Sequence, residues 1–454
     1  MQKKVFIKTF GCQMNEHDSQ AMLVMLQKDG YVLADRPEEA DLVLLNTCTI
    51  REKAYHKAMS ELGRTFQRKK LKADVKIGVT GCAAQQGKES IVERFKHVDF
   101  VLGPDELARL PVVAALPKGS KPVVATELIN SREDYEFLDV VPPQQVQGAT
   151  AFVSIMNGCN CQCIYCIVPS VRGREVCRSG SEIVDQVQRL VEKGVKEVML
   201  LGQNVASYRD PLYGDHLVLP VAGTGNQPRS LAQLIRLLVK ETQIERLRFI
   251  SPHPRDFEDT LIAAFRDVPQ LCSAVHLPAQ SGNNNVLKRM RRGYTREHYL
   301  NIVQQLRSAR PGIALSTDMI VGFPGETDAE FAESVSLIQE VGHDGLYAFT
   351  YSERPGTFAK SDLADDVPEH VKEERLKILL DVHREVAAQK NQQCVGNVAK
   401  VLVTGSDKAG KHSLSGRGED NRNVHFDGPY SLVGQVVPVK ITSALGFSLE
   451  GQIC

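Results

Sequence analysis

Three cysteines lie close together near the middle of the chain. Cys159, Cys163 and Cys166 follow the stretch AFVSIMNG with the spacing C-x3-C-x2-C, and we call them the loop triad. Three thiolates on one short loop can hold three irons of a [4Fe–4S] cluster and leave the fourth iron open. The open iron can chelate the amino and carboxylate groups of S-adenosylmethionine (SAM), whose sulfonium is cleaved by electron transfer. The spacing therefore predicts a cluster site that uses SAM.

One more cysteine, Cys161, lies inside the same segment. The segment therefore also permits a four-cysteine zinc site, although ligands at alternate positions suit a tetrahedral metal poorly. We interpret Cys161 as a bystander. The remaining cysteines have no motif partner and are expected to be structural: Cys177, Cys272, Cys394 and Cys454.

A second set of three cysteines, the sheet-edge triad, is spread over the first part of the chain. Cys12, Cys48 and Cys82 each end a predicted strand, in FIKTFGC, LVLLNTC and KIGVTGC. The carboxyl ends of parallel strands share one edge of a sheet, so the three thiols can converge. Two of them follow glycine, which lets the backbone approach a bulky inorganic group. Three inert buried thiols are the alternative. A zinc site would need a fourth ligand, so three thiolates favour an iron–sulfur cluster.

Alternating strands and helices must position both triads. The strands KVFIKTF, DLVLLN and KIGVT alternate with helices over Ser19–Lys28, Arg51–Lys70 and Ser90–Phe95. Continuous apolar strands in such a series predict a doubly wound parallel sheet. After the linker-like stretch at 133–150, six further strand–helix units predict a partial (β/α)6 barrel. From about Asn397, short strands and glycine turns predict a small five-stranded β-barrel. We place the three domains at 1–125, 145–380 and 384–454.

The composition is typical of a soluble globular protein, with 42% hydrophobic and 24% charged residues. The formal net charge is zero, so no global basic field indicates a nucleic-acid partner, although local basic patches remain compatible with one. No apolar run approaches the roughly 18 residues of a membrane span. We expect a cytoplasmic protein that binds no membrane and whose thiols stay reduced.

Several segments resemble the methylthiotransferase family of radical SAM enzymes over essentially the whole chain. FGCQMNEHDS, LLNTCTIREKA and GVTGCAAQ resemble its N-terminal domain. GCNCQCIYC, LLGQNVASY, HLPAQSGNNNVLKRMRRGYT, STDMIVGFPGET and SERPGTFA resemble its radical SAM core. HSLSGRGEDNRNVHF resembles its TRAM module, an RNA-binding β-barrel.

The residues after Cys12 and Cys48 indicate the branch of that family that acts on dimethylallylated adenosine in tRNA. Here Gln13-Met14-Asn15 follows Cys12. Relatives that act on threonylcarbamoyl-adenosine usually have lysine and valine at the positions of Gln13 and Met14. The relative that modifies a ribosomal protein usually has a leucine at Phe10 and proline-lysine after Cys12. Those two substrates, and a non-catalytic RNA-binding iron–sulfur protein, remain the alternatives.

The resemblance implies transfer of a methylthio group to C2 of N6-dimethylallyladenosine next to the tRNA anticodon. That carbon has no usable acidity, so acid–base chemistry cannot open its C–H bond, whereas a 5′-deoxyadenosyl radical can. The resemblance implies two [4Fe–4S] clusters, with the sheet-edge triad as the sulfur platform, and two equivalents of SAM per turnover. Expected partners are the tRNA and an electron donor such as flavodoxin or ferredoxin, and we expect a monomer.

Contacts with SAM are expected from residues at the carboxyl ends of the barrel strands, with turn chemistry or core packing as the alternative for each. These residues are Gln203, Asn204, Gln280, Ser281, Asp318, Val321 and Phe323. Tyr165, between the last two cysteines of the loop triad, is added because it occupies the position of the family's usual aromatic residue.

Contacts with RNA are expected at a basic run and in the C-terminal barrel: Lys288, Arg289, Arg291, Arg292, Arg417, Asn421 and Arg422. A second basic run fits a solvated helix face equally well. It comprises Arg64, Arg68, Lys69, Lys70, Lys72 and Lys76.

Overall fold

The computed structural model describes residues 2–49, 52–71, 74–117, 119–141, 149–211, 230–407 and 410–454, and leaves aside the side chains of 52–54, 68, 70 and 71. Arg51 and Lys72, named above, therefore lie outside the described residues, as do the side chains of Arg68 and Lys70.

Six parallel strands form the N-terminal sheet in the order β2-β1-β3-β4-β5-β6. The strand order reverses between β1 and β3, which is the switch point where open α/β sheets bind their ligands. The predicted doubly wound sheet is thus confirmed. The strands are β1 (Lys3–Thr9), β2 (Tyr31–Leu33), β3 (Leu42–Thr47), β4 (Lys76–Gly81), β5 (Phe100–Leu102) and β6 (Val123–Ala125).

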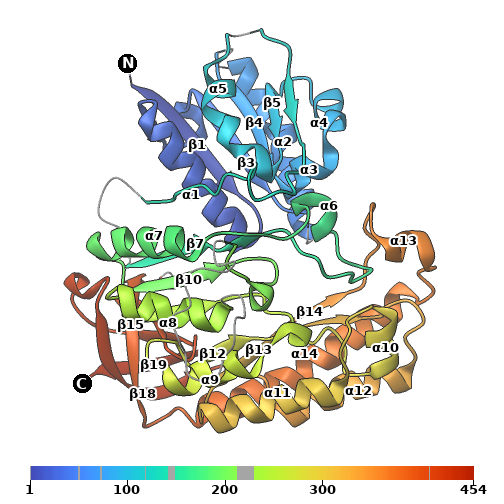
Figure 1. Cartoon of the computed structure of the whole chain (residues 1–454), viewed down its shortest axis with the longest axis vertical. Helices are drawn as coiled ribbons and strands as arrows, with labels where there is room; N and C mark the ends of the chain where they lie inside the picture. The colour runs from blue at the N-terminus through green and yellow to red at the C-terminus, as the bar shows by residue number, and fades with distance from the viewer. Residues whose placement is uncertain are drawn as a thin grey trace.

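Helices cover both faces of this sheet (Figure 1). On β3, Leu42 and Leu44 pack with α1 (Gln13–Lys28) and α5 (Leu110–Ala115), whereas Val43 and Leu45 pack with α2 (Glu52–Leu71), α3 (Cys82–Gly87) and α4 (Glu89–Arg94). Successive strand residues point to opposite faces, so a strand between two helical layers is apolar throughout.

Helix α1 begins at Gln13, directly after Cys12, whereas the apolar periodicity predicted a start at Ser19. Its first two turns bury the polar side chains of Asn15, His17, Asp18 and Ser19, and hydrogen bonds that the periodicity does not reveal hold this part of the helix. Asn15 Nδ2 donates to Asn46 Oδ1 at 3.0 Å, and Asn46 Nδ2 donates to the Asn15 carbonyl at 2.7 Å.

The middle of the chain forms the predicted partial barrel. Its six parallel strands lie in two sheets, β7-β10-β11 and β12-β13-β14, which a parallel bridge between Leu247 and Leu271 connects. These strands are β7 (Thr150–Ser154), β10 (Glu197–Leu201), β11 (Arg246–Phe249), β12 (Ala274–His276), β13 (Ala314–Val321) and β14 (Gly345–Thr350).

The outer layer of the partial barrel is helical and encloses the largest core cluster (Figure 1). It comprises α7 (Gly180–Glu192), α8 (Leu231–Glu241), α9 (Asp259–Asp267), α11 (Arg296–Ala309) and α12 (Asp328–Val341). The short helices α6 (Val168–Arg172), α10 (Asn284–Arg289) and α13 (Phe358–Asp362) lie at the ends of the strands.

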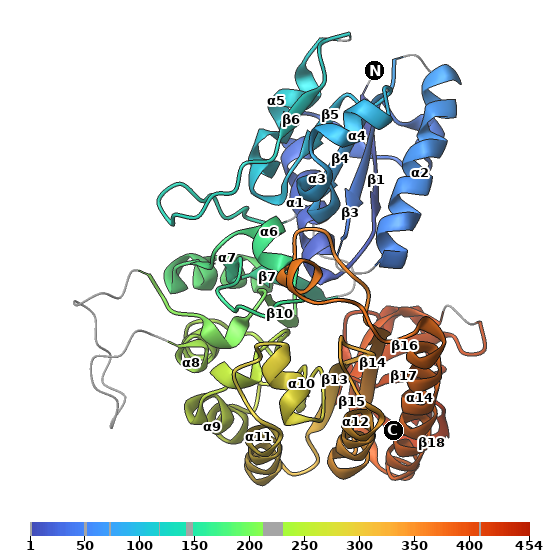
Figure 2. The same cartoon turned by 90° about the vertical axis from the view of Figure 1, so that its right-hand side faces the viewer.

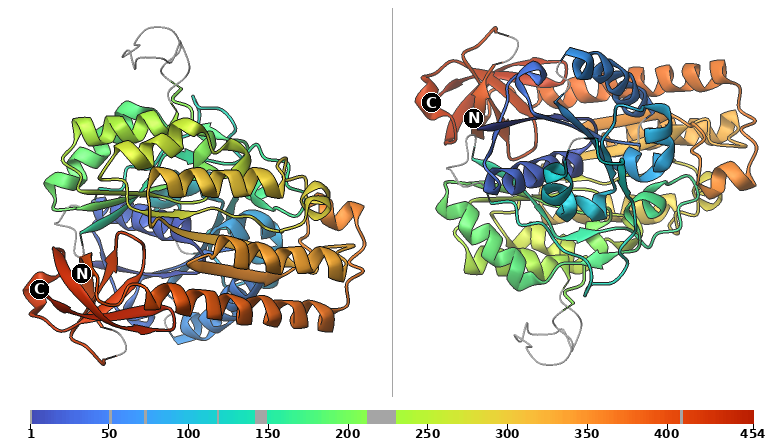
Figure 3. Two further views of the ribbon diagram at one scale, coloured as in Figure 1. Left: turned by 90° about the horizontal axis from the view of Figure 1, so that it is seen from below. Right: turned by 90° about the horizontal axis from the view of Figure 1, so that it is seen from above.

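The C-terminal residues form the predicted five-stranded closed barrel, β15-β16-β17-β19-β18. The long helix α14 (Glu369–Gln392) leads into it and lies along β14 and α12 (Figure 3). The strands are β15 (Val398–Ser406), β16 (Leu414–Gly418), β17 (Asn423–Phe426), β18 (Val436–Leu445) and β19 (Ser448–Ile453).

The N-terminal unit lies beside the partial barrel, where α1 packs against the edge strand β7 and α6 lies between the two units (Figure 2). Helix α6 follows the loop triad and packs against α3, which begins with Cys82. The fold therefore brings the two cysteine triads to the same domain interface.

Candidate functional site

The loop triad lies on a loop that a short hairpin holds in place. Strand β8 (Met156–Asn157) pairs with β9 (Val176–Cys177), and Cys159 N–H donates to the Gly173 carbonyl at 3.2 Å. Gly158 has φ +78°, and a Cβ there would lie 2.0 Å from the Arg174 carbonyl oxygen. Only glycine fits at that turn. The loop is thus fixed at its entrance by backbone geometry.

Two nitrogen donors approach Cys163, which is 7% exposed. Arg292 Nη1 lies 3.4 Å from Cys163 Sγ, and His253 Nε2 lies 3.8 Å from the same sulfur. Hydrogen bonds from a cation or a ring N–H stabilise a thiolate, which is the form that binds a metal. The surroundings of Cys163 therefore suit a thiolate ligand.

At Cys166, burial disfavours the thiolate form. It raises the pKa of Cys166 to about 12, and the nearby sulfur of Cys163 raises the pKa further. A thiol with a raised pKa keeps its proton until a metal displaces it, so cluster binding at this loop releases protons. Three thiols on one loop, with two nitrogen donors at Cys163, fit an iron–sulfur cluster.

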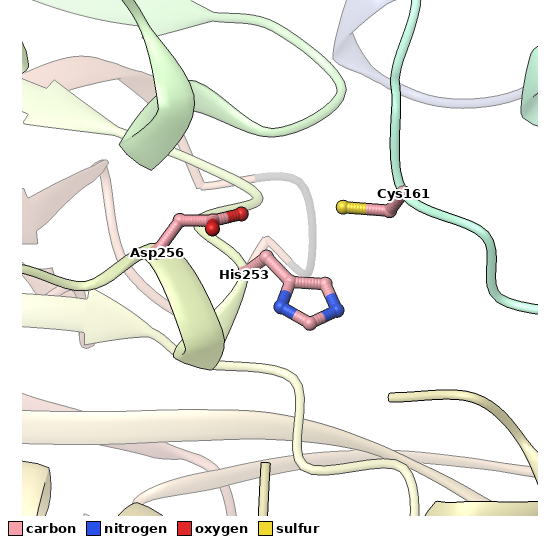
Figure 4. Close-up of side chains that lie close together, drawn as sticks. All are labelled: Cys161, His253 and Asp256. Atoms are coloured by element: carbon pink, nitrogen blue, oxygen red, sulfur yellow. The ribbon is translucent and has the colours of Figure 1, made fainter. Parts of the chain in front are cut away.

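Cys161 belongs to a different small group (Figure 4), together with His253 and Asp256. Their potential ligand atoms lie within 4.8 Å of one another. The atoms are already hydrogen-bonded: His253 Nδ1 accepts from Arg255 N–H at 3.2 Å, and Asp256 Oδ2 accepts from Asn204 Nδ2 at 2.7 Å. Asn204 and Arg255 also lie 3.6 and 3.5 Å from Cys161 Sγ. This arrangement is a hydrogen-bonded network.

The residues expected to contact SAM are divided between half-buried and buried positions. Gln203 and Asp318 are half-buried, and Asp318 lies 3.4 Å from His276 of the neighbouring strand β12. Asn204 is 2% exposed and holds the loop at 253–256 through its amide, since its Oδ1 accepts from His253 N–H at 2.9 Å.

The other expected SAM contacts are mostly buried. Ser281 is 1% exposed and lies 3.3 Å from Ser334. Val321 belongs to the barrel core. Phe323 packs edge-on against Tyr165 of the cysteine loop, with ring centroids 6.4 Å apart. Gln280 has φ +69° and places its backbone N–H on the Asp318 carbonyl at 2.8 Å.

The sheet-edge triad lies where β1, β3 and β4 end side by side. Cys48 and Cys82 are 1% and 2% exposed, and Cys12 is half-buried. Burial raises the pKa of Cys82 to about 11, and the proximity of Cys48 and Cys12 contributes to that rise. The three thiols are therefore close enough to interact electrostatically, as the strand-end positions predicted.

The glycines before Cys12 and Cys82 have a packing role in the structure. Gly11 has φ +133°, and a Cβ there would lie 2.6 Å from Cys48 Cβ. Gly81 has φ +89°, and a Cβ there would lie 2.4 Å from Asn46 Oδ1. The strand ends can approach one another this closely only because these residues are glycines. The same glycines can also leave room for an inorganic group.

Arg172 connects the two triads. It lies at the end of α6, is 3% exposed, and donates from Nη2 to Asp18 Oδ2 of α1 at 2.6 Å. The positive charge of Arg172 also offsets part of the rise that burial causes in the pKa of Cys82. Ile167, the residue after Cys166, packs with Val171 against Cys82. The sequence did not indicate this connection, because Arg172 and Asp18 are 154 residues apart.

The residues expected to bind RNA differ in how they are placed. Lys288 and Arg291 are exposed, with Arg291 lying 5.8 Å from the ring centroid of the exposed Phe358. Arg289 forms two hydrogen bonds of 2.9 Å with Glu330. Arg292 is 5% exposed and lies against Cys163 of the cysteine loop. It is therefore not on the surface, where an RNA contact was expected.

In the C-terminal barrel, the candidate residues lie at the turn between β16 and β17. Asn421 is exposed, with φ +68°. Arg422 pairs with Asp344 of the core and Asp420, and the Arg417 carbonyl accepts from Arg246 at 3.2 Å. This turn therefore docks the small barrel onto the partial barrel.

In the second basic run, Lys69 pairs with Asp99 at 2.6 Å.

Three comparisons with known proteins agree with this architecture. Family models match residues 4–103 (Uncharacterized protein family UPF0004), 153–338 (Radical SAM superfamily) and 392–454 (TRAM domain). Proteins named tRNA-2-methylthio-N(6)-dimethylallyladenosine synthase are similar over nearly the whole chain. That of Xanthomonas euvesicatoria is 45% identical over 99% of this chain and 91% of its own length. That of Herminiimonas arsenicoxydans is 43% identical over 100% and 99%.

A solved structure has the same fold at low sequence identity. The radical S-adenosylmethionine methyltransferase TsrM from Kitasatospora setae, with cobalamin and a [4Fe-4S] cluster bound, aligns with a TM-score of 0.56. It is 14% identical, and the alignment covers 87% of this chain and 79% of that one. No helix within the described residues is long and apolar enough to cross a membrane.

Proposed function

The chain belongs to the radical SAM methylthiotransferase family, among the tRNA-2-methylthio-N(6)-dimethylallyladenosine synthases, and on that basis we propose its substrate and the division of labour between its two triads. The substrate is tRNA that carries N6-dimethylallyladenosine next to the anticodon. The product carries a methylthio group at C2 of that base.

The loop triad is the radical site in this proposal. Membership of the Radical SAM superfamily implies a [4Fe–4S] cluster and SAM, and Cys159, Cys163 and Cys166 are the residues that would hold the cluster. When bound, the cluster supplies the electron that cleaves SAM and yields the 5′-deoxyadenosyl radical that takes hydrogen from C2. Tyr165 and Phe323 would form an apolar wall beside the cluster, since their rings pack together and Phe323 is fully buried.

The sheet-edge triad is the sulfur platform in this proposal, where Cys12, Cys48 and Cys82 would hold a second [4Fe–4S] cluster. The observation that carries this proposal is the contact between Cys82 and the segment that follows the loop triad. Ile167 follows Cys166 and packs with Val171 against Cys82, and the charge of Arg172 at the end of α6 lowers the pKa of Cys82. A sulfur donor must lie beside the radical site, because the substrate radical reacts with what it touches. Two equivalents of SAM are then consumed, one for the methyl group and one for the radical.

The tRNA would approach the exposed basic and aromatic side chains near the cysteine loop, which are Lys288, Arg291 and Phe358. Cationic side chains bind phosphate, and an exposed aromatic ring offers a surface on which an unpaired base stacks. The C-terminal barrel, which carries Asn421, docks beside Arg246 and Asp344 at the amino ends of β11 and β14, so it would contact a separate part of the tRNA. We also propose that the enzyme acts as a monomer and accepts electrons from a small donor protein such as flavodoxin or ferredoxin.

The substrate assignment is tested with reconstituted full-length protein, SAM, a reductant and defined tRNAs. We expect the methylthio product on dimethylallylated tRNA, detected by nucleoside mass analysis, and none on the same tRNA with unmodified adenosine. Product on threonylcarbamoylated tRNA, without product on dimethylallylated tRNA, would overturn the assignment. Formation of 5′-deoxyadenosine is measured in the same samples, so that a poorly reconstituted cluster is recognised.

A further inference from the structure

His253 lies beside the loop triad although it is 90 residues from Cys163 in sequence. It precedes η4 (Pro254–Asp256), the turn after β11, and it is 7% exposed. Its backbone N–H donates to Asn204 Oδ1 at 2.9 Å, its ring Nδ1 accepts from Arg255 N–H, and its ring packs nearly perpendicular to that of Tyr294, with centroids 5.7 Å apart. The imidazole therefore has a fixed orientation.

The tautomer of this ring follows from its hydrogen bonds. His253 Nδ1 accepts from the backbone N–H of Arg255 at 3.2 Å, so Nδ1 carries no proton. A neutral imidazole has one donor and one acceptor nitrogen, and the proton must therefore be on Nε2. Nε2 lies 3.8 Å from Cys163 Sγ, within reach of an N–H···S hydrogen bond. The ring thus points a donor at a cluster ligand.

The same tautomer argues against a metal site formed by Cys161, His253 and Asp256. With Nδ1 occupied by Arg255 and Nε2 protonated, the ring has no free lone pair for a metal. Asp256 is engaged as well, since its Oδ1 accepts from Arg255 Nε at 2.9 Å and its Oδ2 from Asn204. The residues of Figure 4 are instead linked through Asn204, which bonds both the His253 backbone and Asp256.

Arg292 is a second donor to the same sulfur. Its Nη1 lies 3.4 Å from Cys163 Sγ and 3.4 Å from Tyr165 Oη, and its Nη2 donates to the Pro278 carbonyl at 2.9 Å. Its Nε lies 3.3 Å from Tyr294 Oη. A guanidinium fixed in this way presents its positive charge at one ligand of the triad.

We propose that His253 is a positioning residue that donates its Nε2–H to Cys163 Sγ and, together with Arg292, raises the reduction potential of the loop-triad cluster. The inference rests on the [4Fe–4S] cluster that the superfamily implies for this loop, and it does not depend on which tRNA is modified. Hydrogen bonds to cluster sulfurs favour the reduced state, which carries one more negative charge.

Two substitutions of one residue separate the donor from the structural role of the ring. In His253→Asn the amide oxygen occupies the place of Nδ1 and keeps the hydrogen bond from Arg255, but no N–H reaches Cys163. In His253→Gln the longer amide places an N–H near the position of Nε2. His298→Asn is the matched control, because His298 lies 3.2 Å from the Pro254 carbonyl and contacts the same turn without contacting the cysteine loop.

The measurement is a dithionite redox titration of reconstituted full-length protein, followed by electron paramagnetic resonance in a Cys48→Ala background that leaves only the loop triad complete. We expect a more negative midpoint potential in His253→Asn, a potential close to that of the parent in His253→Gln, and no shift in His298→Asn. An unchanged potential in His253→Asn with full iron content would overturn the proposal.

A second measurement covers the case in which His253→Asn fails to hold the cluster. Histidines are labelled with ¹⁵N in the parent protein with the Cys48→Ala change, and nitrogen couplings to the reduced cluster are recorded by pulsed resonance. We expect a histidine coupling. Its absence would refute a hydrogen bond from His253 to the cluster ligand. The tRNA product is assayed separately, so failure of this inference and failure of the proposed function are distinguishable.

Discussion

Arg172 donates to Asp18 at 2.6 Å, and this pair joins the helix after the loop triad to the first helix of the N-terminal sheet. Both side chains are buried, at 4% and 8% exposure. Burial alone would raise the pKa of Asp18, but Arg172 and His17 hold the pKa below its usual value. Asp18 is therefore ionised in the folded protein, and the ion pair is part of the interface at which the two triads meet.

Arg172→Met should destabilise the protein substantially, because it leaves the carboxylate of Asp18 buried without its partner. The expected loss is about 3–5 kcal/mol in the free energy of unfolding. Arg189→Met is the control, since Arg189 and Asp139 form a pair at 46% and 42% exposure, and such pairs contribute at most about 1 kcal/mol. Urea unfolding of the two variants compares them. Equal losses would show that the buried pair has no special weight.

Asp105 should make stability depend on pH in a defined window. Burial raises the pKa of Asp105 to about 6, despite hydrogen bonds from Ile129 N–H and Asn157. The unfolded chain has a pKa near 4 at this residue, so the folded state binds more protons between about pH 4 and pH 6. The contribution of Asp105 is thus fully present below pH 4 and declines as pH rises to 6.

The test of this effect is thermal unfolding of the parent and of Asp105→Asn from pH 4 to pH 7. The difference between the two proteins should change across pH 4–6 in favour of the asparagine variant as pH rises. Asp139→Asn, at an exposed position, should leave the pH profile as it is in the parent. A difference that stays constant over this range would contradict the raised pKa.

Gly11→Ala should damage the sheet-edge triad. The backbone at Gly11 has φ +133°, and the added Cβ would lie 2.6 Å from Cys48 Cβ. Gly30→Ala is the control for backbone strain without a steric clash, because Gly30 has φ +82° but nothing within 4 Å of the added Cβ. Both carry a strain of about 1–2 kcal/mol. Iron analysis should show a loss of bound iron only in Gly11→Ala, and full iron content in that variant would contradict the close packing.

Lys288→Ala combined with Arg291→Ala should weaken tRNA binding without affecting SAM cleavage. Each phosphate contact removed lowers the salt dependence of binding by roughly one unit of slope. Arg36→Ala, at 75% side-chain exposure on the N-terminal unit, is the control for loss of positive charge. Binding is measured by filter retention at several salt concentrations. An unchanged slope in the double variant would show that this surface does not contact phosphate.

The sequence was informative where the signal is local. The spacing of Cys159, Cys163 and Cys166 predicted one loop, and the strand-end positions of Cys12, Cys48 and Cys82 predicted one edge of a parallel sheet. Both placements hold because strand direction alone brings such positions together. The six barrel strands and the closed C-terminal barrel followed from the alternation of apolar segments.

The contacts around the triads could not be read from the sequence, because they join residues far apart in the chain. His253 and Cys163 are 90 residues apart, and Arg172 and Asp18 are 154 apart. Arg292 was expected to bind RNA because it belongs to a basic run, and Arg422 because it lies in a family motif at a loop. Arg292 is instead buried beside the cysteine loop, and Arg422 pairs with Asp344. A basic residue type gives charge but not the direction in which the side chain points.

In the proposed reaction the two triads have separate roles, and product analysis of Cys48→Ala beside Cys163→Ala tests both roles together. Each reconstituted protein is given SAM, reductant and dimethylallylated tRNA, and 5′-deoxyadenosine and the methylthiolated nucleoside are quantified by mass spectrometry. We predict that Cys163→Ala forms neither product, whereas Cys48→Ala cleaves SAM but forms no methylthiolated nucleoside. Full methylthiolation by Cys48→Ala would show that the sheet-edge triad is not the sulfur platform.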